Sequence, residues 1–387
     1  MSREKIKRVA VISHLYAHYR EALFNEMIKN SPYRYEFLGC KNGFGTGIAL
    51  LDHFPDNRFV KTKGWMLGPL FIQPAAITAA LSSKYDTLIL TGNMMWPTMW
   101  AAAIIGRVRG KRVLMWTHGW LREESGLKRR FRDIFYRLAH GLLLYNNRAK
   151  EIGIAHGFDP DRMYVIYNSL DADTQRSVRD SIDSERIETI RNEYFPGRAH
   201  YPVLATVTRL MPDKRIDMLI NAAEILERNG FPVNILIVGS GPEEKNLRDQ
   251  AESKGVAVHF SGAVYDEHTL GEVLMAADLT VMPGAIGLLV MHSMAYGTPV
   301  ISHNNFDNQG PENEAIVEGI TGGFFEEGSV ESLAQAIEHW VSNPEKLTAG
   351  KAEAISMIDK FYNPQSQRNR IDFAVSGKPS IDNGSGL

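Results

Sequence analysis

VLATVTRLMPDK, residues 203–214, contains the pattern from which the fold can be predicted. Val203–Val207 is an apolar run rich in β-branched residues, which is typical of a strand buried in a parallel sheet. Apolar residues at helical spacing follow over 216–226, so Arg209 and Lys214 fall on the loop between a strand and a helix. Such loops bind ligands in open α/β sheets, and the first amides of a helix attract anions. The two cations predict a diphosphate site; the alternative is a solvated loop that carries two charges.

The rest of the second half continues this alternation of buried strands and helices. Six of its motifs resemble the donor-binding half of the retaining family 4 glycosyltransferases (glycosyl transferases group 1), which have the GT-B fold. Each motif alone is weak evidence, but all six occur in the family's order over 203–325. They are RLMPDK, VGSGPEE, FSGAV, AADLTVMP, MAYGTPV and EAIVEGITG.

The resemblance implies an α/β protein of the GT-B type, with two Rossmann-like domains facing each other across a deep cleft. The expected parts are an acceptor-binding N-terminal domain over 1–171, a linker over 172–200, a donor-binding domain over 201–361, a helix over 362–376 that crosses back to the first domain, and a tail over 377–387. Within the first domain, the apolar pattern over 71–82 predicts a single helix.

The charge of the chain is divided unevenly between its halves. Residues 1–170 hold 25 Lys+Arg and 13 Asp+Glu, a net charge of +12, whereas the remainder holds 18 against 32, a net charge of −14. Opposite signs point to two domains with different partners. The one cysteine, Cys40, cannot form an internal disulfide, and no apolar run approaches the roughly 20 residues of a membrane span. With no signal-peptide pattern at the N-terminus, we expect a cytoplasmic protein.

Polar side chains follow two of the strands expected in the first domain. His14, His18, Tyr19 and Arg20 come after the first strand and are acceptor-binding candidates; the alternative is that they cap a helix or lie on its solvated face. His118 directly follows another strand. Family 4 enzymes commonly have a histidine at that place near the donor sugar, so the resemblance implies a catalytic role; the alternative is a hydrogen-bonded structural histidine.

The family pattern is broken at two positions on the donor side. It has a glutamate before the helix that follows the fourth strand, and a second glutamate eight residues later; these contact the donor sugar and the ribose. Gly284 and His292 occupy those positions here, so both carboxylates are missing, and Glu312 or Glu314 could take over the sugar contact. The donor-binding residues that the resemblance implies are Gly241, Ala263, Val264, Gly284, Gly287, Leu288, His292, Glu312 and Glu314.

The implied donor is a nucleoside diphosphate sugar, UDP- or GDP-linked, used without a cofactor and with retention of configuration. Arg209 and Lys214 would act with His118 in catalysis, and because two cations can substitute for a metal, we expect metal independence. One alternative is a non-catalytic sugar-nucleotide-binding protein of a polysaccharide assembly complex. Another is a nicotinamide-dependent oxidoreductase, but the first strand is followed by SHLYAHYR and not by a Gly-x-Gly-x-x-Gly fingerprint.

The segment GLKRRFRDIFYRLAHG, residues 126–141, predicts a basic amphipathic helix. Lys128, Arg129, Arg130, Arg132 and Arg137 supply its charge, and its apolar stripe is Phe131, Ile134, Phe135 and Leu138. A domain helix with a solvated basic face is one interpretation, and an element that lies on an anionic membrane is the other. We expect a glycan or lipid-linked glycan acceptor in bacterial surface polysaccharide synthesis, a peripheral contact with the inner face of the membrane, and no nucleic-acid partner.

Overall fold

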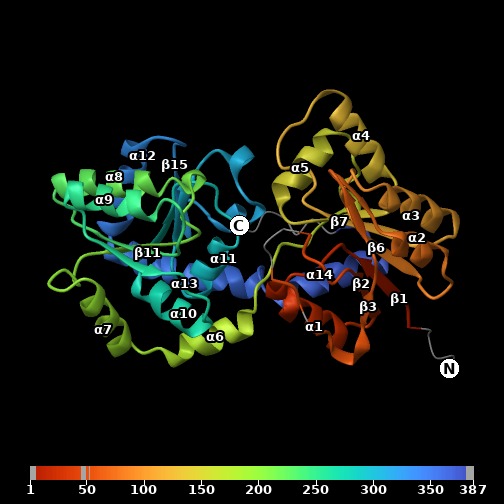
Figure 1. Cartoon of the computed structure of the whole chain (residues 1–387), viewed down its shortest axis with the longest axis horizontal. Coiled ribbons are helices and arrows are strands. Elements are labelled where there is room, and N and C mark those ends of the chain that lie inside the picture. Colours follow the sequence, from red (N-terminus) through yellow and green to blue (C-terminus); the bar gives the residue numbers. More distant parts are fainter. Residues whose placement is uncertain (1–5, 45–48, 52, 381–387) are drawn as a thin grey trace. The chain divides into compact units, whose positions relative to one another are not determined.

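The structure is a computed structural model that describes residues 6–44, 49–51 and 53–380. The chain divides into two compact units, each built on its own parallel sheet (Figure 1). Unit 1 combines Met1–Asp171 with Tyr362–Leu387, and unit 2 is Ala172–Phe361. Of the tail expected over 377–387, residues 381–387 lie outside the described residues.

Unit 1 contains a parallel sheet of seven strands. They are β1 (Arg8–Ile12), β2 (Arg34–Gly39), β3 (Phe59–Lys61), β6 (Thr87–Thr91), β7 (Arg112–Thr117), β8 (Gly141–Leu144) and β9 (Met163–Val165). Their order in space is β3-β2-β1-β6-β7-β8-β9. The order reverses between β1 and β6, and the crevice at such a switch point is the usual ligand site of an open α/β sheet.

Helices cover both faces of this sheet and enclose two separate cores. The helices are α1 (Glu21–Lys29), α2 (Pro74–Leu81), α3 (Pro97–Val108), α4 (Gly126–Arg137), α5 (Asn147–Ala155) and α14 (Pro364–Ser376). Val9 and Val11 of β1 pack in the core that contains residues of α1 and α14. Ala10 and Ile12 pack in the core that contains residues of α2 and α3. This alternation follows from the two-residue period of a strand.

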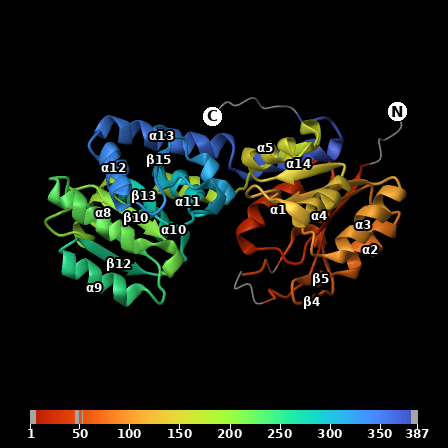
Figure 2. The same cartoon turned by 90° about the horizontal axis from the view of Figure 1, so that it is seen from above.

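Unit 2 has a six-stranded parallel sheet in the order β12-β11-β10-β13-β14-β15, with α8 and α12 on one face and α10 on the other (Figures 1 and 2). Its strands are β10 (Val203–Val207), β11 (Asn234–Val238), β12 (Val258–Gly262), β13 (Leu279–Met282), β14 (Val300–His303) and β15 (Gly322–Phe325). Its helices are α6 (Ala172–Ser181), α7 (Ser184–Tyr194), α8 (Ile216–Arg228), α9 (Glu244–Lys254), α10 (Glu267–Ala276), α11 (Leu289–Ala295), α12 (Val330–Val341) and α13 (Pro344–Lys360).

The predicted α/β class is confirmed, since both sheets are parallel and doubly wound. The single helix predicted over 71–82 is wrong at its start. Residues 65–72 form an antiparallel hairpin of β4 (Trp65–Leu67) and β5 (Leu70–Ile72), and α2 begins only at Pro74. Gly68 turns the hairpin with a φ of 60°, a left-handed conformation that glycine adopts without a steric penalty.

Residues 172–200, expected as a linker, differ from that expectation because they form α6 and α7 within unit 2. Both helices are fastened to that unit by charged side chains, α6 through Arg176, which pairs with Asp359 at 2.8 Å, and α7 through two arginines. Arg186 pairs with Glu272 at 2.7 Å, and Arg191 pairs with Asp278 at 2.7 Å. Ile190 of α7 is buried, so this segment has a buried apolar residue despite its polar composition.

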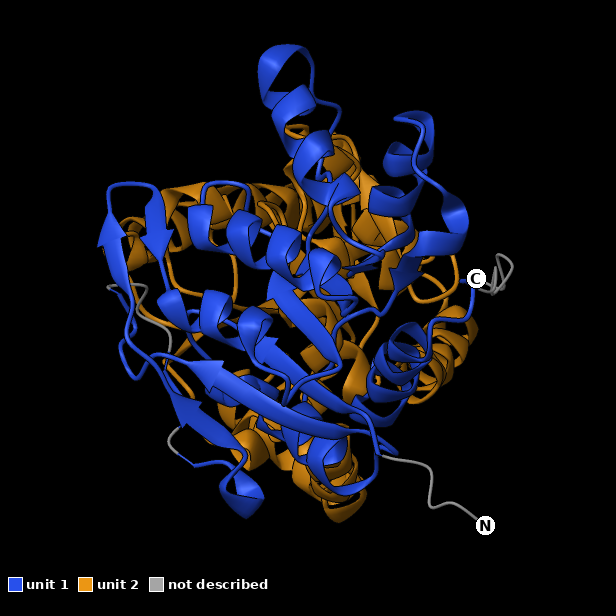
Figure 3. Ribbon diagram, turned by 90° about the vertical axis from the view of Figure 1, so that its right-hand side faces the viewer, with its two compact units in different colours: residues 1–171, 362–387 blue, residues 172–361 orange. Residues whose placement is uncertain are grey.

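The last helix, α14, belongs to unit 1, where its colour in Figure 3 matches that of residues 1–171. Ile371 is fully buried in the core next to α1. Asp372 accepts a hydrogen bond from the Tyr35 hydroxyl at 2.7 Å, and Arg368 pairs with Glu26 at 2.9 Å. Burial raises the pKa of Asp372, although hydrogen bonds from Tyr35 and Ser31 oppose that rise.

Candidate functional site

In unit 2 the strand order reverses between β10 and β13, and the loops that follow these two strands lie against each other. The Gly284 amide donates to the Lys214 carbonyl at 3.0 Å, and Lys214 Nζ donates to the Ala285 carbonyl at 3.3 Å. These two bonds fix the loop after β10 at the carboxyl edge of the sheet, where open α/β sheets bind ligands.

The predicted cations both lie on this loop. Lys214 Nζ is 3.3 Å from the Asp213 carboxylate, and its side chain remains 26% exposed. Arg209 is exposed and forms no ion pair with any residue that the structure describes. Its guanidinium therefore remains available to an anion, and guanidinium groups bind phosphate oxygens through pairs of hydrogen bonds.

Three glycines allow the neighbouring loops to approach the loop after β10. A Cβ atom on Gly239 would lie 1.8 Å from the Thr208 carbonyl oxygen, and one on Gly241 would lie 2.3 Å from that of Leu210. A Cβ atom on Gly284 would lie 2.2 Å from the Asp213 carbonyl oxygen. The backbone packing around Gly284 leaves no room for a side chain, so a glutamate does not fit at this position unless the backbone shifts.

The residues after Gly284 lead into α11. The amides of Gly287 and Leu288 have no hydrogen-bond acceptor within the described ranges. Glu312 is buried with its carboxylate next to this segment, since a Cβ atom on Gly287 would lie 3.9 Å from Glu312 Oε2. Glu314 lies on the same short 3₁₀ helix and is half-buried.

The remaining predicted donor residues lie after β12 and on α11. Ala263 is exposed, whereas Val264 packs against the apolar core of unit 2. His292 Nδ1 lies 3.2 Å from the amide nitrogen of Gln175 and 3.8 Å from the Glu267 carboxylate. Burial alone would raise the pKa of Glu267, but hydrogen bonds from His292, Tyr296 and Gln175 lower it overall. His292 is therefore already engaged with a carboxylate from another helix.

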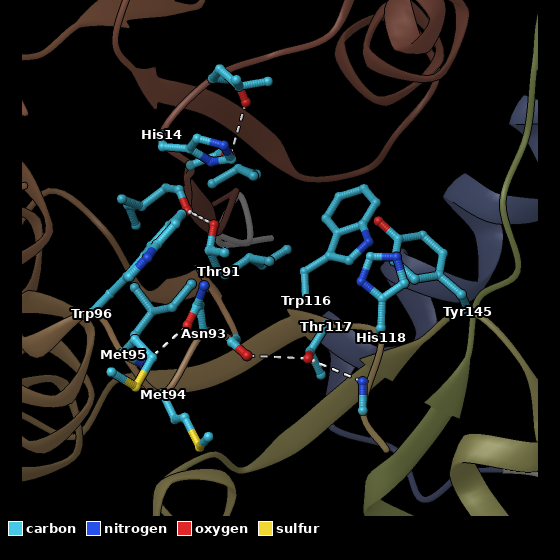
Figure 4. A pocket seen from close by; sticks show the side chains of 18 of the residues that line it. His14, Thr91, Asn93, Met94, Met95, Trp96, Trp116, Thr117, His118 and Tyr145 are labelled. Atoms are coloured by element: carbon cyan, nitrogen blue, oxygen red, sulfur yellow. Dashed lines mark hydrogen bonds between the residues drawn. The ribbon is translucent and has the colours of Figure 1, made fainter. Parts of the chain in front are cut away.

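Unit 1 contains a cavity of about 690 Å³ at the carboxyl ends of β1, β6, β7 and β8 (Figure 4). This volume is in the usual range for small-molecule sites. Aromatic side chains surround it: Trp96 follows β6, Trp116 lies at the end of β7, and Tyr145 follows β8. The Nε1 atom of Trp116 is buried without a hydrogen-bond partner among the described residues.

Three of the four predicted acceptor residues, His14, Tyr19 and Arg20, line this cavity, as does His118. The fourth, His18, lies outside it; this residue is exposed, and its Nδ1 is 3.2 Å from the Ala49 carbonyl oxygen. Residues predicted separately after β1 and after β7 therefore line one and the same cavity.

Both cavity histidines are neutral at pH 7. Burial lowers the pKa of His14 to about 4. Burial, followed by the positive charge of Arg20, lowers the pKa of His118 to about 4. The His14 ring packs edge-on against Trp96 with centroids 4.9 Å apart, and the His118 ring lies 4.8 Å from that of Tyr145. A neutral imidazole can donate one hydrogen bond and accept another, which suits the hydroxyl groups of a sugar.

Sequence reasoning missed Trp116 and Tyr145 as lining residues. Both residues continue apolar runs that are typical of buried strands, VLMW over 113–116 and LLLY over 142–145. The available signal was their position at the carboxyl ends of two neighbouring parallel strands, where side chains face the ligand crevice.

Two features are absent from the described residues. None of their helices combines the length and apolar character needed to cross a bilayer. No cluster of three or more His, Cys, Asp or Glu side chains among them is arranged to hold a metal ion.

Comparison with known proteins connects this geometry to a family. Residues 191–357 match the family Glycosyl transferases group 1. A glycogen synthase of Pseudomonas syringae pv. syringae is 28% identical over 166 residues, which are 40% of this chain and 32% of that protein. A GDP-mannose-dependent alpha-(1-6)-phosphatidylinositol dimannoside mannosyltransferase of Mycobacterium tuberculosis is 30% identical over 143 residues, 36% of this chain and 35% of that protein. The chain thus spans about a third of the length of each relative.

Solved structures match nearly the whole chain at low identity. Anabaena HepE, solved in complex with UDP, superposes with a TM-score of 0.69 at 18% identity, covering 96% of this chain and 100% of HepE. A glycosyltransferase from Rickettsia africae superposes with a TM-score of 0.69 at 14% identity, covering 98% and 100%. These similarities show a shared fold. Residues 191–357 are therefore similar to the glycosyl transferases group 1 family, and the chain has the GT-B fold.

Proposed function

We propose that this protein is a glycosyltransferase that moves a sugar from a UDP- or GDP-linked donor to a glycan or lipid-linked glycan. The observation that carries the proposal is the loop with Arg209 and Lys214 at the switch point of the group 1 domain. Unit 2 would bind the donor and unit 1 the acceptor. We further propose that transfer proceeds with retention of configuration, in the cytoplasm, as a step of surface polysaccharide synthesis.

The proposed chemistry follows from where negative charge develops. As the bond between the sugar and the diphosphate breaks, charge accumulates on the leaving phosphate oxygen. Arg209 and Lys214, held ready at that place, would stabilise the transition state more than the ground state. The amides of Gly287 and Leu288 would point toward the same charge. In unit 1, neutral His118 would contact a hydroxyl group of the substrate through one of its ring nitrogens.

What is known of similar proteins supports the class of donor. The mycobacterial relative is named as GDP-mannose-dependent, and HepE has been solved with UDP and with UDP-glucose. Because the chain covers only part of its relatives, neither sugar is assigned to it.

A screen of UDP- and GDP-linked sugars, followed by mass spectrometry, tests the proposal. We expect release of UDP or GDP together with a sugar-bearing product or, without acceptor, slow hydrolysis. Proton NMR of the fresh product would report retention. Nucleotide binding without any turnover would instead support a non-catalytic sugar-nucleotide-binding protein. This alternative follows from position 284, where a glycine replaces the carboxylate of the family pattern.

We expect activity to persist in excess EDTA. Two cations on the diphosphate loop supply positive charge that other enzymes obtain from a bound metal ion. The measurement is the initial rate of nucleotide release before and after chelation. Loss of activity that Mg²⁺ or Mn²⁺ restores would contradict the proposal of metal independence.

Unit 1 is also expected to bind anionic vesicles through α4. This helix leaves three apolar side chains in solvent: Leu127 is 81% exposed, Phe131 48% and Ile134 57%. Arg129 and Arg130 lie on the same helix. A basic residue near an anionic leaflet contributes about 1 kcal/mol, so Arg129→Gln with Arg130→Gln should weaken binding roughly 30-fold at low salt.

Flotation with phosphatidylserine-containing vesicles measures this effect. Lys245→Gln with Arg248→Gln on α9 is the matched control, because these two cations are exposed and pair with acids on their own helix, as Arg129 does. Leu127→Ser with Ile134→Ser tests the apolar side chains separately. If the wild type ignores anionic vesicles even at low salt, a soluble acceptor becomes the better proposal.

A further inference from the structure

The cavity of unit 1 has an excess of positive charge that the proposed sugar acceptor does not by itself explain. Four cationic side chains line it: Arg20, Arg122, Lys128 and Arg132. Glu124 is the one carboxylate among the described lining residues. Because His14 and His118 are neutral at pH 7, they do not add to this charge.

Two of the four cations pair with Glu124. Its carboxylate accepts two hydrogen bonds from Arg132, at 2.7 and 2.9 Å, and lies 3.1 Å from Lys128 Nζ. These contacts lower the pKa of Glu124 against the effect of its burial. One carboxylate offsets a single unit of this charge, so the lining keeps an excess of positive charge, and Arg20 and Arg122 are the cations in it that form no ion pair with a described residue.

Arg20 is held inside the cavity by aromatic rings. Its guanidinium carbon lies 5.5 Å from the centroid of Trp116, 5.2 Å from that of Tyr145 and 5.7 Å from that of Tyr19. Ring faces orient a guanidinium and partly compensate for its desolvation, but they carry no net charge. In the part of the chain that the structure describes, no carboxylate is within ion-pairing distance of Arg20.

Arg122 also lines this cavity. Its side chain is exposed and forms no ion pair with a described residue. Arg20 and Arg122 therefore each offer the cavity a positive charge without a paired carboxylate among the described residues. A partly buried cation without a counter-charge is unfavourable, and an anionic ligand removes that cost.

The other polar atoms of the cavity suit a sugar. His14 and Trp116 line the cavity, and one ring nitrogen of each, Nδ1 and Nε1, has no partner among the described residues. Trp96 and Tyr145 add aromatic surface against which an apolar ring face can pack. The lining thus combines hydrogen-bonding sites for hydroxyl groups with an uncompensated positive charge.

We propose that the acceptor bound in this cavity is an acidic saccharide, with a phosphate or carboxylate group that Arg20 and Arg122 bind. This inference rests on the proposed function, because it takes the cavity to be the acceptor site. It excludes a purely neutral glycan as the preferred ligand. Phosphate and carboxylate share the chemistry that a guanidinium recognises, and the probes below distinguish them.

Binding of three monosaccharides tests the proposal without any donor present. Glucose, glucose 6-phosphate and glucuronate are titrated against the protein, with quenching of tryptophan fluorescence as the signal. We expect at least one acidic sugar to bind about 10- to 100-fold more tightly than glucose, the range for hydrogen bonds to charged groups. A preference for glucose 6-phosphate alone assigns the group to phosphate, and a similar preference for both sugars admits a carboxylate.

Arg20→Gln and Arg122→Gln should each reduce this preference by roughly tenfold or more. Arg109→Gln is the matched control, because Arg109 is an exposed cation of unit 1 that does not line the cavity. The exposed position of Arg122 keeps the test valid if Arg20→Gln fails to fold. Equal affinity for glucose and both acidic sugars, or an unchanged preference in both variants, would overturn the proposal.

The same variants separate this inference from the proposed function. UDP titration should give the same affinity for Arg122→Gln and wild type, because unit 2 binds the nucleotide. An acidic-sugar preference with no sugar transfer in the donor screen would reject the proposed function and leave the anion site standing. Transfer to acceptors without such a preference would reject the anion site alone.

Discussion

Replacement of Arg209 or Lys214 by alanine is expected to lower kcat by about 10²- to 10³-fold, equivalent to roughly 2.7–4 kcal/mol of lost transition-state stabilisation. The two side chains lie on the loop that Gly284 and Ala285 hold in place. Their charge acts most strongly when the leaving phosphate becomes more negative, so kcat should fall more than KM rises.

Steady-state rates of nucleotide release check this expectation, with circular dichroism to establish that each variant folds. Arg228→Ala provides the control, since Arg228 is an exposed cation at the far end of α8. Rates close to wild type in both Arg209→Ala and Lys214→Ala would remove the two residues from the catalytic role.

Gly284→Glu restores the carboxylate of the family pattern, yet we expect it to lower both stability and activity. The first atom of any side chain there would lie 2.2 Å from the Asp213 carbonyl oxygen and 2.8 Å from Lys214 Cα. Overpacking of this kind typically costs about 1–3 kcal/mol. For a unit of this size that corresponds to a fall in Tm of several degrees, roughly 2–4 °C for each kcal/mol.

Gly284→Ala isolates the steric part of the effect, because it adds Cβ without a charge. Gly287→Ala is the stability control, since the nearest atom to a Cβ atom there is 3.9 Å away. Differential scanning calorimetry should show a lower Tm for both Gly284 variants and little change for Gly287→Ala. If Gly284→Glu gains activity, the close approach of the two loops is not required for function.

The fold could be predicted because parallel strands buried on both faces appear as short continuous apolar runs. Val203–Val207 and Asn234–Val238 have this appearance, and both are strands of the sheet of unit 2. The β4–β5 hairpin was missed for the opposite reason. Trp65 and Leu67 are apolar yet exposed, so their pattern does not indicate a buried face.

The site was only partly predictable, because distances across a sheet do not appear in the sequence. Arg209 and Lys214 could be found from their place after a strand. The cavity of unit 1 joins the ends of four strands, and only the strand order shows that Trp116 and Tyr145 meet Arg20 there. Gly284 looked like the loss of a functional group, and the packing of the backbone around it gives the physical reason.

The assignment of α14 to unit 1 has a consequence for biosynthesis. Unit 2 is one continuous segment, Ala172–Phe361, whereas unit 1 is assembled from both ends of the chain. A ribosome that adds about 5–20 residues per second takes roughly 10–40 s to synthesise the intervening segment. During that interval the core that contains Leu23 and Phe24 lacks the side chains of α14, among them Ile371. The core of unit 1 can therefore be completed only after α14 has left the ribosome.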